Sequence, residues 1–410
     1  MRRVLKRATG GDTRDRLAAL ERRMRGLVET QRDQVASLHA ELAAIAEKIG
    51  EKASRKDVRE LLGAVRGLGS QIDRQVEDQL AHGGAAEQQR LTERRLFKRL
   101  DEIAASGKPI VVGPWTGEVG FEVLYWAPFL AWARGRWNLA PERHVIVSRG
   151  GVQSWYGMPE ARYVDLFSLV TPAEFRSTTN QEEHKQRRES PFDREMLEAT
   201  LARAAVSEAD HLHPEQMYRV FMPFWRDEAG FATLDRFTRY ARLDPPGDPV
   251  LNDLPADYIA SRFYFSDAFP DTPENRAFAR AVIATISERV PVVLLNPGVA
   301  VDDHSDLAAA AAGRVFTIER GLAPDRNLAV QSAVIGRARA FVGTYGGYSY
   351  LAPFFGVPAI AFYSERSFKL HHLHVAQRVF ERLGGADVMP IDTAHAPLVQ
   401  MALSTVSAAS

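Results

Sequence analysis

Two glutamates near the end of the first buried strand are the residues best suited to acid–base chemistry. Glu118 stands between glycines in the loop Pro114-Trp115-Thr116-Gly117-Glu118-Val119-Gly120, and Glu122 follows one helical turn later. A carboxylate at a strand end, near a helix N-terminus and beside an aromatic ring, can accept a proton from a hydroxyl group. We therefore predict Glu118 and Glu122 as catalytic candidates, with Trp115 and Gly117 lining the substrate. The alternative for Glu118 is that it only caps the following helix.

A long uncharged stretch near the C-terminus is the second place where we expect chemistry. No charged residue occurs from Ala340 to Ser364, which is long enough to suggest a membrane helix. Glycines at 343, 346 and 347 and prolines at 353 and 358 interrupt it, so a continuous helix does not fit. The pattern instead predicts a strand (340–342), a glycine turn, a short helix (about 348–355) and a second strand (359–363). Because backbone N–H groups at such a turn can face a phosphate, we interpret this unit as the holder of a nucleotide-linked diphosphate.

The glutamates require an element that holds them at a sheet edge. Residues 109–113 and 144–148 read as buried strands, and 121–132 reads as a helix with a proline in or near it. This is a βαβ unit, which binds ligands at the carboxyl ends of its strands. Arg149 follows the second strand beside a glycine pair, so it contacts either a substrate anion or a surface carboxylate.

Residues 152–242 are less informative and are interpreted as an elaboration of the first domain. The polar run 181–189 reads as a solvated loop or helix, and residues 163–167 as a strand or helix. His211 and His213 are too few for a metal site. The aromatic residues of 217–237 fit a helix core better than a binding platform.

A second α/β unit follows the sequence Asp-Pro-Pro-Gly-Asp-Pro at 244–249, which is typical of a linker. Strands are predicted at 258–265, 291–295 and 314–318, and helices at 274–288 and about 327–337. This alternation predicts a doubly wound parallel sheet. The predicted fold class is therefore α/β, with two Rossmann-like domains preceded by a long α-helical segment.

The first hundred residues carry apolar positions spaced by three and four from Leu17 to Leu80, flanked by charges. This heptad pattern predicts a coiled coil and self-association through residues 14–80; the alternative is a helix folded back on its own domain. The first 25 residues hold nine basic and three acidic side chains, which fits either a solvated tail or peripheral contact with an anionic membrane. The expected divisions are 1–13 (basic terminus), 14–106 (coiled coil), 107–243 (first domain), 244–250 (linker) and 251–410 (second domain).

The amino-acid composition excludes some classes of partner and of chemistry. Lys+Arg and Asp+Glu both number 52, so no overall basic field favours nucleic acid. There is no cysteine, which removes disulfides and thiol catalysis and fits a reducing compartment. The basic N-terminus is not followed by an apolar core of the secretory type. We expect a cytoplasmic protein, with the inner face of the membrane as the alternative.

Two such domains joined by a short linker resemble the GT-B glycosyltransferases. The resemblance depends on Phe341-Val342-Gly343-Thr344-Tyr345-Gly346-Gly347, on Leu351-Ala352 and on Gly356-Val357-Pro358. These are similar to the donor-site signature of heptosyltransferase-like and fucosyltransferase-like members, in which a Gly-Thr turn opens a helix that ends in Gly-x-Pro. The layout extends over about 108–395, and the motif only over the last third of the chain.

The resemblance implies a nucleotide diphosphate sugar on the second domain and a glycan or lipid-linked acceptor on the first. It implies that Arg262 offsets phosphate charge, that Asn296 and Gly298 edge the nucleotide pocket and that Glu319 binds a ribose hydroxyl. It also implies a diphosphate site, which is expected to comprise Thr344, Tyr345, Gly346, Gly347 and Tyr348. Glu118 matches the acidic loop residue that some members use as base.

The resemblance also implies catalysis without a metal or other cofactor. Asp302-Asp303-His304 is interpreted as a solvated loop rather than a metal site, and His371-His372-His374 as a helix surface, because no carboxylate or cysteine partner is matched to them. The alternatives to a glycosyltransferase are an epimerase or pyruvyl transferase on the same scaffold, or a non-enzymatic coiled-coil scaffold protein.

Overall fold

The computed structural model describes residues 87–179, 186–295, 305–307, 313–318, 322–366 and 370–396. The heptad pattern of residues 14–80 and the basic N-terminus therefore lie outside the described residues. Only the end of the predicted coiled-coil segment is described, as a helix over residues 87–106. Within residues 88–410, both sheets belong to one compact unit. No helix in the described ranges is long and apolar enough to cross a membrane.

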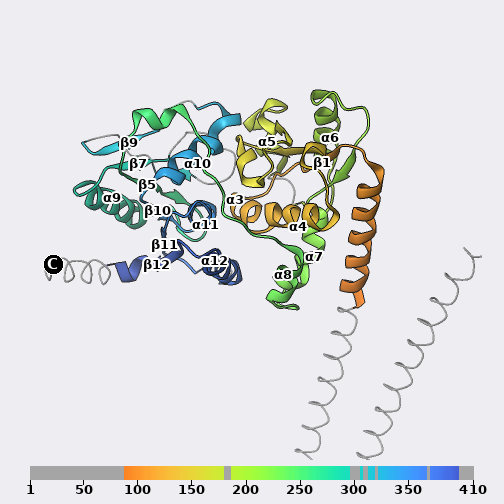
Figure 1. Ribbon diagram of the computed structural model, residues 1–410. Coiled ribbons are helices and arrows are strands. Elements are labelled where there is room, and N and C mark those ends of the chain that lie inside the picture. The colour runs from red at the N-terminus through yellow and green to blue at the C-terminus, as the bar shows by residue number, and fades with distance from the viewer. Residues whose placement is uncertain are drawn as a thin grey trace, which may run out of the picture. The chain divides into compact units, whose positions relative to one another are not determined.

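The first sheet, of which β1 is labelled in Figure 1, has four parallel strands in the order β3-β2-β1-β4. These strands are β1 Ile110–Val112, β2 His144–Ser148, β3 Arg162–Asp165 and β4 Asp210–Leu212. Its helices are α3 Val119–Phe121, α4 Ala127–Trp137, α5 Pro172–Thr179, α6 Pro191–Arg203, α7 Glu215–Trp225 and α8 Phe231–Phe237. The β4 strand was not predicted from the sequence.

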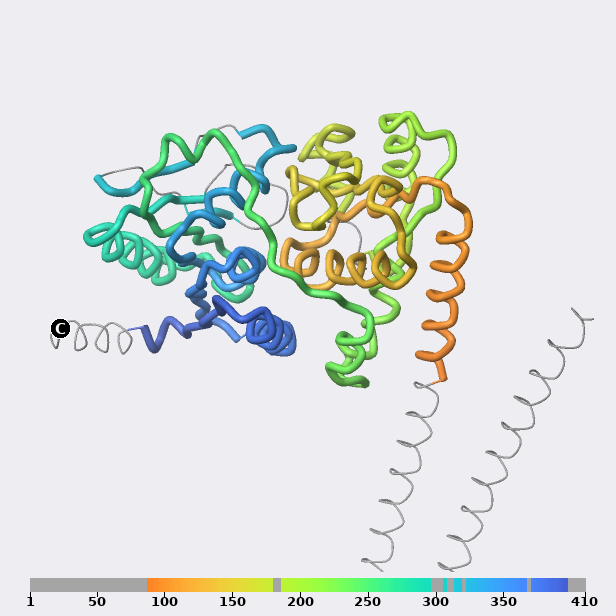
Figure 2. Tube along the Cα trace, viewed as in Figure 1, coloured from red at the N-terminus to blue at the C-terminus, as the bar shows by residue number. Residues whose placement is uncertain are grey.

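The second sheet has six parallel strands in the order β12-β11-β10-β5-β7-β9. They are β5 Ile259–Arg262, β7 Val292–Leu294, β9 Val315–Thr317, β10 Ala340–Thr344, β11 Ala359–Tyr363 and β12 Val388–Asp392; β6 Tyr264–Phe265 and β8 Ser305–Asp306 form a separate antiparallel pair. The helices are α9 Pro273–Ser287, α10 Asn327–Arg337, α11 Gly347–Phe354 and α12 Leu370–Leu383. A mixed α/β fold with two parallel sheets is thus confirmed. The connection, green in Figure 2, has no helix or strand over 238–248.

Both faces of each sheet are covered, which explains the continuous apolar strands. In β1, Ile110 and Val112 point into the main core, whereas Val111 packs with Phe175 and Met196 of α5 and α6 on the other face. In the second sheet, Phe341 faces the main core and Val342 faces the cluster that contains residues of α9. The main core contains residues from both sheets.

Local signals fix where the helices begin. Ser190 and Asp193 form a reciprocal capping box at the start of α6, and the Thr272 hydroxyl accepts from the Asn275 N–H at the start of α9. The predicted helix at 327–337 is confirmed as α10. The aromatic residues of 217–237 are largely core, as predicted, with Tyr218, Phe221, Phe224 and Trp225 buried.

The helix after β1 contains a π-helical turn, Glu122–Trp126, between α3 and α4. Pro128 has no N–H to donate to the Leu124 carbonyl, and its ring crowds the carbonyl four residues earlier. The Leu124 carbonyl accepts from the Tyr240 hydroxyl instead, at 2.9 Å. The proline therefore accounts for the wider turn. Such turns occur often at functional sites.

Candidate functional site

The loop after β1, residues 113–118, is held from several directions. Gly113 has a φ of +116°, and a Cβ there would lie 2.4 Å from the Val147 carbonyl oxygen, so glycine is required. The Gln186 side chain donates to the Pro114 carbonyl (2.6 Å) and accepts from the Thr116 N–H (3.0 Å). His211 Nε2 lies 2.7 Å from the Gly113 carbonyl oxygen. These contacts hold the loop, and with it the residues that follow, in a fixed position.

Gln186 and His211 were missed as supports of this site. Of the predicted solvated run 181–189, Gln186 is buried, whereas residues 187–189 are exposed as predicted; residues 180–185 lie outside the described ranges. The neighbouring His213 is also buried, with Nε2 3.1 Å from Asp193 Oδ2 and Nδ1 accepting from the Glu215 N–H. The polar composition of both segments gives no sign that Gln186 and His213 are buried.

Glu118 is exposed at the start of α3 and makes no side-chain capping hydrogen bond. Simple helix capping therefore does not explain this residue. Burial, followed by the charge of Glu118, raises the pKa of the Tyr218 hydroxyl, which places the carboxylate near that ring. Glu118 is thus an accessible carboxylate at the carboxyl edge of the first sheet, the position that acid–base chemistry requires.

Glu122 is fully buried and does not face solvent. Its Oε1 accepts from the Ser148 hydroxyl (2.6 Å) and the Tyr156 hydroxyl (2.5 Å), and its Oε2 lies 3.7 Å from Arg149 Nη1. Burial raises the pKa of Glu122 to about 7, although Arg149 and the two hydroxyl groups lower it. A catalytic role in direct contact with substrate does not fit an enclosed carboxylate.

Trp115 is also fully buried, so it is not an open platform for a ligand. Its ring stacks near Trp126 (6.0 Å between centroids) and Tyr218 (6.3 Å). A Cβ at Gly117 would lie 2.9 Å from the Trp115 ring, so this glycine allows the loop to fold over the indole. Both predicted substrate-lining residues act here as packing for the loop.

Arg149 is directed inward and not to the surface. Its side chain is 8% exposed, and Nη2 donates to the Gly117 carbonyl at 2.5 Å. The guanidinium carbon lies 6.0 Å from the centre of the Phe175 ring. Of the two alternatives for Arg149, a surface salt bridge is excluded by this burial.

Arg262 lies at the carboxyl end of β5, as predicted for a residue near the donor. Its Nε donates to Asp306 (2.9 Å), its Nη1 donates to Gln331 (2.9 Å), and its guanidinium lies 4.4 Å from the centre of the Tyr348 ring. Burial lowers the pKa of Arg262, but Tyr348 and Asp306 together raise it above its usual range. Asp306 already offsets much of the positive charge.

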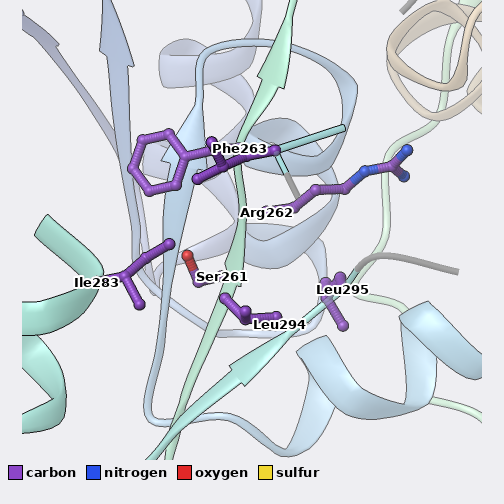
Figure 3. A pocket seen from close by; sticks show the side chains of 7 residues that line it. Ser261, Arg262, Phe263, Ile283, Leu294 and Leu295 are labelled. Carbon is purple, nitrogen blue, oxygen red and sulfur yellow. The ribbon is translucent and has the colours of Figure 1, made fainter. Parts of the chain in front are cut away.

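A small, mostly apolar pocket adjoins Arg262, between α9 and the strands β5 and β7. Its lining residues are Ser261, Arg262, Phe263, Ile283, Leu294, Leu295 and Leu307. In Figure 3 the guanidinium of Arg262 points away from Ser261 and Ile283. The guanidinium of Arg262 therefore does not project into this pocket.

The glycine turn after β10 is occupied mainly by packing contacts. The buried Thr344 hydroxyl donates to the Tyr264 carbonyl (2.8 Å) and accepts from the Tyr264 N–H (3.1 Å). The Tyr345 and Tyr350 hydroxyls hydrogen-bond to each other, and a Cβ at Gly346 would collide with the Tyr264 hydroxyl. The side chains of Thr344 and Tyr345 are therefore already engaged within the protein.

Gly347 brings the two predicted centres together. A Cβ at Gly347 would lie 2.8 Å from the Gly120 nitrogen and 3.0 Å from the Val119 Cβ, so the N-terminal ends of α3 and α11 are in contact. Glu118 immediately precedes Val119. The loop that carries Glu118 and the turn after β10 thus lie side by side, although more than 200 residues separate them in the sequence.

Three predicted site residues, Asn296, Gly298 and Glu319, lie outside the described ranges, and so does the predicted solvated loop 302–304. The residues 370–374 are described, and there His374 is exposed as predicted, whereas His371 and His372 are half-buried and His372 Nδ1 lies 2.6 Å from the Tyr125 hydroxyl. Within the described residues, no group of three or more histidine, aspartate or glutamate side chains could hold a metal ion.

No protein-family model matches the chain, and no curated protein matches its sequence. Among solved structures, it is similar to ADP-heptose LPS heptosyltransferase II from E. coli, with 12% identity and a TM-score of 0.38 over 69% of this chain and 90% of that one. A glycosyl transferase family 9 protein from Veillonella parvula has 12% identity and a TM-score of 0.34, over 73% and 89%. A putative UDP-N-acetylglucosamine 2-epimerase from Listeria monocytogenes has 14% identity and a TM-score of 0.30, over 73% and 88%. TM-scores this low assign neither a family nor an activity.

Proposed function

We propose that this chain is a glycosyltransferase that moves a sugar from a nucleotide diphosphate sugar to a hydroxyl group of a glycan or lipid-linked acceptor. The observation that supports it is the contact between Gly347 and Gly120, which puts the exposed Glu118 next to the N-terminal end of α11. A transferase needs this arrangement, because the base belongs to the acceptor side and the anchor for the leaving group to the donor side.

In the proposed reaction, Glu118 takes the proton of the acceptor hydroxyl. The acceptor oxygen then bonds to the anomeric carbon, and the bond between that carbon and the diphosphate oxygen breaks, so that the electron pair leaves with the diphosphate. The first backbone N–H groups of α11 and the guanidinium of Arg262 stabilise the departing charge. Since Gly347 is packed on Gly120, the diphosphate is proposed to lie beside this contact and not within it.

Binding of a nucleoside diphosphate tests the donor side. Thermal unfolding is measured with the diphosphates UDP, GDP, ADP and TDP and with the monophosphate CMP, and a ligand at about 100 times its dissociation constant adds about 2.7 kcal/mol of stability. Arg262→Gln should remove this gain. Arg339→Gln is the matched control, because Arg339 is exposed and precedes β10 at the opposite end of the sheet. The absence of stabilisation by every nucleotide would contradict the proposal.

Product analysis separates the alternatives. Sugar transfer releases a free nucleoside diphosphate together with a glycosylated acceptor, whereas an epimerase returns an intact nucleotide sugar. A scaffold protein would do neither. Self-association through residues 14–80 and contact with an anionic membrane remain predictions that accompany the proposed function.

A further inference from the structure

A buried ion pair stands behind the loop that carries Glu118. Glu122, from the helix, and Arg149, from the end of β2, face each other with 3.7 Å between Oε2 and Nη1. Their side chains are 0% and 8% exposed. Neither Glu122 Oε2 nor Arg149 Nη1 has a hydrogen-bond partner. A buried charge without a hydrogen bond is costly, so the electrostatic attraction between the two groups is what compensates it.

The other end of Arg149 holds the loop itself. Its Nη2 donates to the Gly117 carbonyl, and that peptide unit leads directly into Glu118. The backbone after Arg149 is fixed in turn by the second sheet's α10. The Gly150 carbonyl accepts from the Ala329 N–H at 2.8 Å, and a Cβ at Gly150 would lie 2.7 Å from Leu328. Arg149 therefore connects the loop to a backbone segment that is itself held in place by α10.

We propose that Arg149 is a positioning residue that sets the direction of Glu118 through the Gly117 carbonyl, and that Glu122 keeps Arg149 in this pose while its carboxyl group is ionised. The proposal rests on the proposed function, since it assigns how the base of that reaction is aimed. It gives Glu122 a role that its burial permits, because the carboxylate acts on Arg149 and not on the substrate.

Other titratable groups face Glu122 from each neighbouring element. Arg149 comes from β2, Tyr156 from the turn at 152–156, and Tyr163 and Asp165 from β3. Asp165 is itself anchored by the Gly151 and Phe167 N–H groups, and it senses Asp325 before α10. Arg149 favours the ionised form of Glu122, whereas Asp165 opposes it. The pKa of Glu122 is raised to about 7, so its charge changes near neutral pH.

Trp115 provides a reporter that does not depend on activity. Its ring lies against Gly117, the residue whose carbonyl Arg149 holds. The full-length protein is labelled with 5-fluorotryptophan, and the Trp115 signal among the six tryptophans is identified by its loss in Trp115→Phe. The fluorine chemical shift is then followed across pH. We expect a transition near pH 7 that is absent in Glu122→Gln, since glutamine keeps the oxygen that accepts from Ser148 and Tyr156 but not the charge.

Two further variants distinguish this coupling from a merely structural role. Arg149→Met should abolish the Trp115 transition, because the guanidinium that connects Glu122 to the Gly117 carbonyl is lost. This expectation holds even where Glu122→Gln fails to fold. Asp165→Asn is the matched control, and it should keep the transition at a slightly lower pH. A Trp115 signal that does not titrate in the wild type, or that still titrates in Glu122→Gln or Arg149→Met, overturns the proposal.

Turnover gives the second readout, once a donor is identified by the nucleotide measurements. Arg149→Met should lower kcat about 10²-fold with the KM for the donor unchanged, as expected when a reacting group is displaced by about 1 Å. Arg149→Lys, which keeps a charge, should recover part of the loss. Failure of all nucleotides to bind would count against the proposed function alone, whereas the fluorine titration decides the positioning role.

Discussion

Gly120 and Gly347 touch across the two sheets: a side chain on Gly347 would begin 2.8 Å from the Gly120 nitrogen. Each glycine lies in the first turn of a helix, so neither helix could approach the other with even a methyl group between them. This contact fixes the distance between the loop that carries Glu118 and the turn after β10. The proposed function is therefore most sensitive to substitutions at these two glycines.

Gly347→Ala should separate the ends of α3 and α11. The added methyl group meets backbone atoms of Gly120 and the Val119 side chain, neither of which is the flexible end of a side chain. Overpacking of this kind costs about 1–3 kcal/mol. We expect a lower free energy of unfolding in denaturant titration. We also expect a loss of turnover that exceeds what this loss of stability explains. Gly247→Ala is the control, since a Cβ there meets nothing within 4 Å; equal effects of the two substitutions would contradict this prediction.

Glu118→Gln should abolish transfer while the fold is retained. A positioned general base contributes about 10²–10⁴-fold to the rate, and glutamine cannot accept the proton. The measurement is initial rate of nucleoside diphosphate release with the donor and acceptor identified, together with thermal unfolding. Glu142→Gln serves as control, because Glu142 is exposed and precedes β2 at the opposite edge of the sheet. Turnover close to wild type in Glu118→Gln would remove Glu118 as the base.

Glu122 should make the protein less stable as pH rises from about 5 to about 8. The carboxyl has a pKa of about 7 in the folded chain against 4.5 for its usual value, so between these values the folded state holds a proton that the unfolded state has released. Stability therefore falls across this window, by about 3 kcal/mol from this group. Glu122→Gln should remove that fall. Denaturant titrations at both pH values would contradict it if the difference between variant and wild type stayed constant.

Thr344→Val should destabilise the protein without weakening nucleotide binding. Valine has nearly the same shape but leaves the buried N–H and carbonyl of Tyr264 without their partner, which costs about 1–3 kcal/mol for each group. Thr344→Ser, which keeps the hydroxyl, is the matched control. Isothermal calorimetry on folded samples measures the dissociation constant of the bound nucleotide. A clear rise in that constant for Thr344→Val would return Thr344 to the diphosphate site.

The parallel α/β fold could be predicted because its strands are continuous apolar runs and its helices have clear ends. Short, polar elements escaped prediction. The β4 strand, Asp210–Leu212, contains only one apolar residue, and its burial depends on pairing with β1. The helix around Glu122 was predicted with a proline nearby, but the partner of the Leu124 carbonyl in its π-helical turn is Tyr240, more than 100 residues later.

The site was predicted less well than the fold, for a reason that the glycines illustrate. A glycine next to a helix N-terminus has the same signal in the sequence whether it admits a phosphate or another backbone. Only the structure shows that Gly347 admits Gly120 and that Gly346 admits Tyr264. Likewise, Arg262 and Arg149 were recognised as cations at strand ends, but their partners Asp306 and Glu122 come from other elements.

The π-helical turn from Glu122 to Trp126 restricts the number of residues that this helix can contain. Each residue of a helix advances the chain by about 100° around its axis. Removing one residue from the turn would leave α4 and its contacts unchanged but rotate everything before it by that angle. Glu122 would then swing out of the pocket formed by Ser148 and Tyr156, and the loop carrying Glu118 would turn with it. Functional versions of this chain should therefore tolerate exchanges of residue type in this turn more readily than any change in its number of residues.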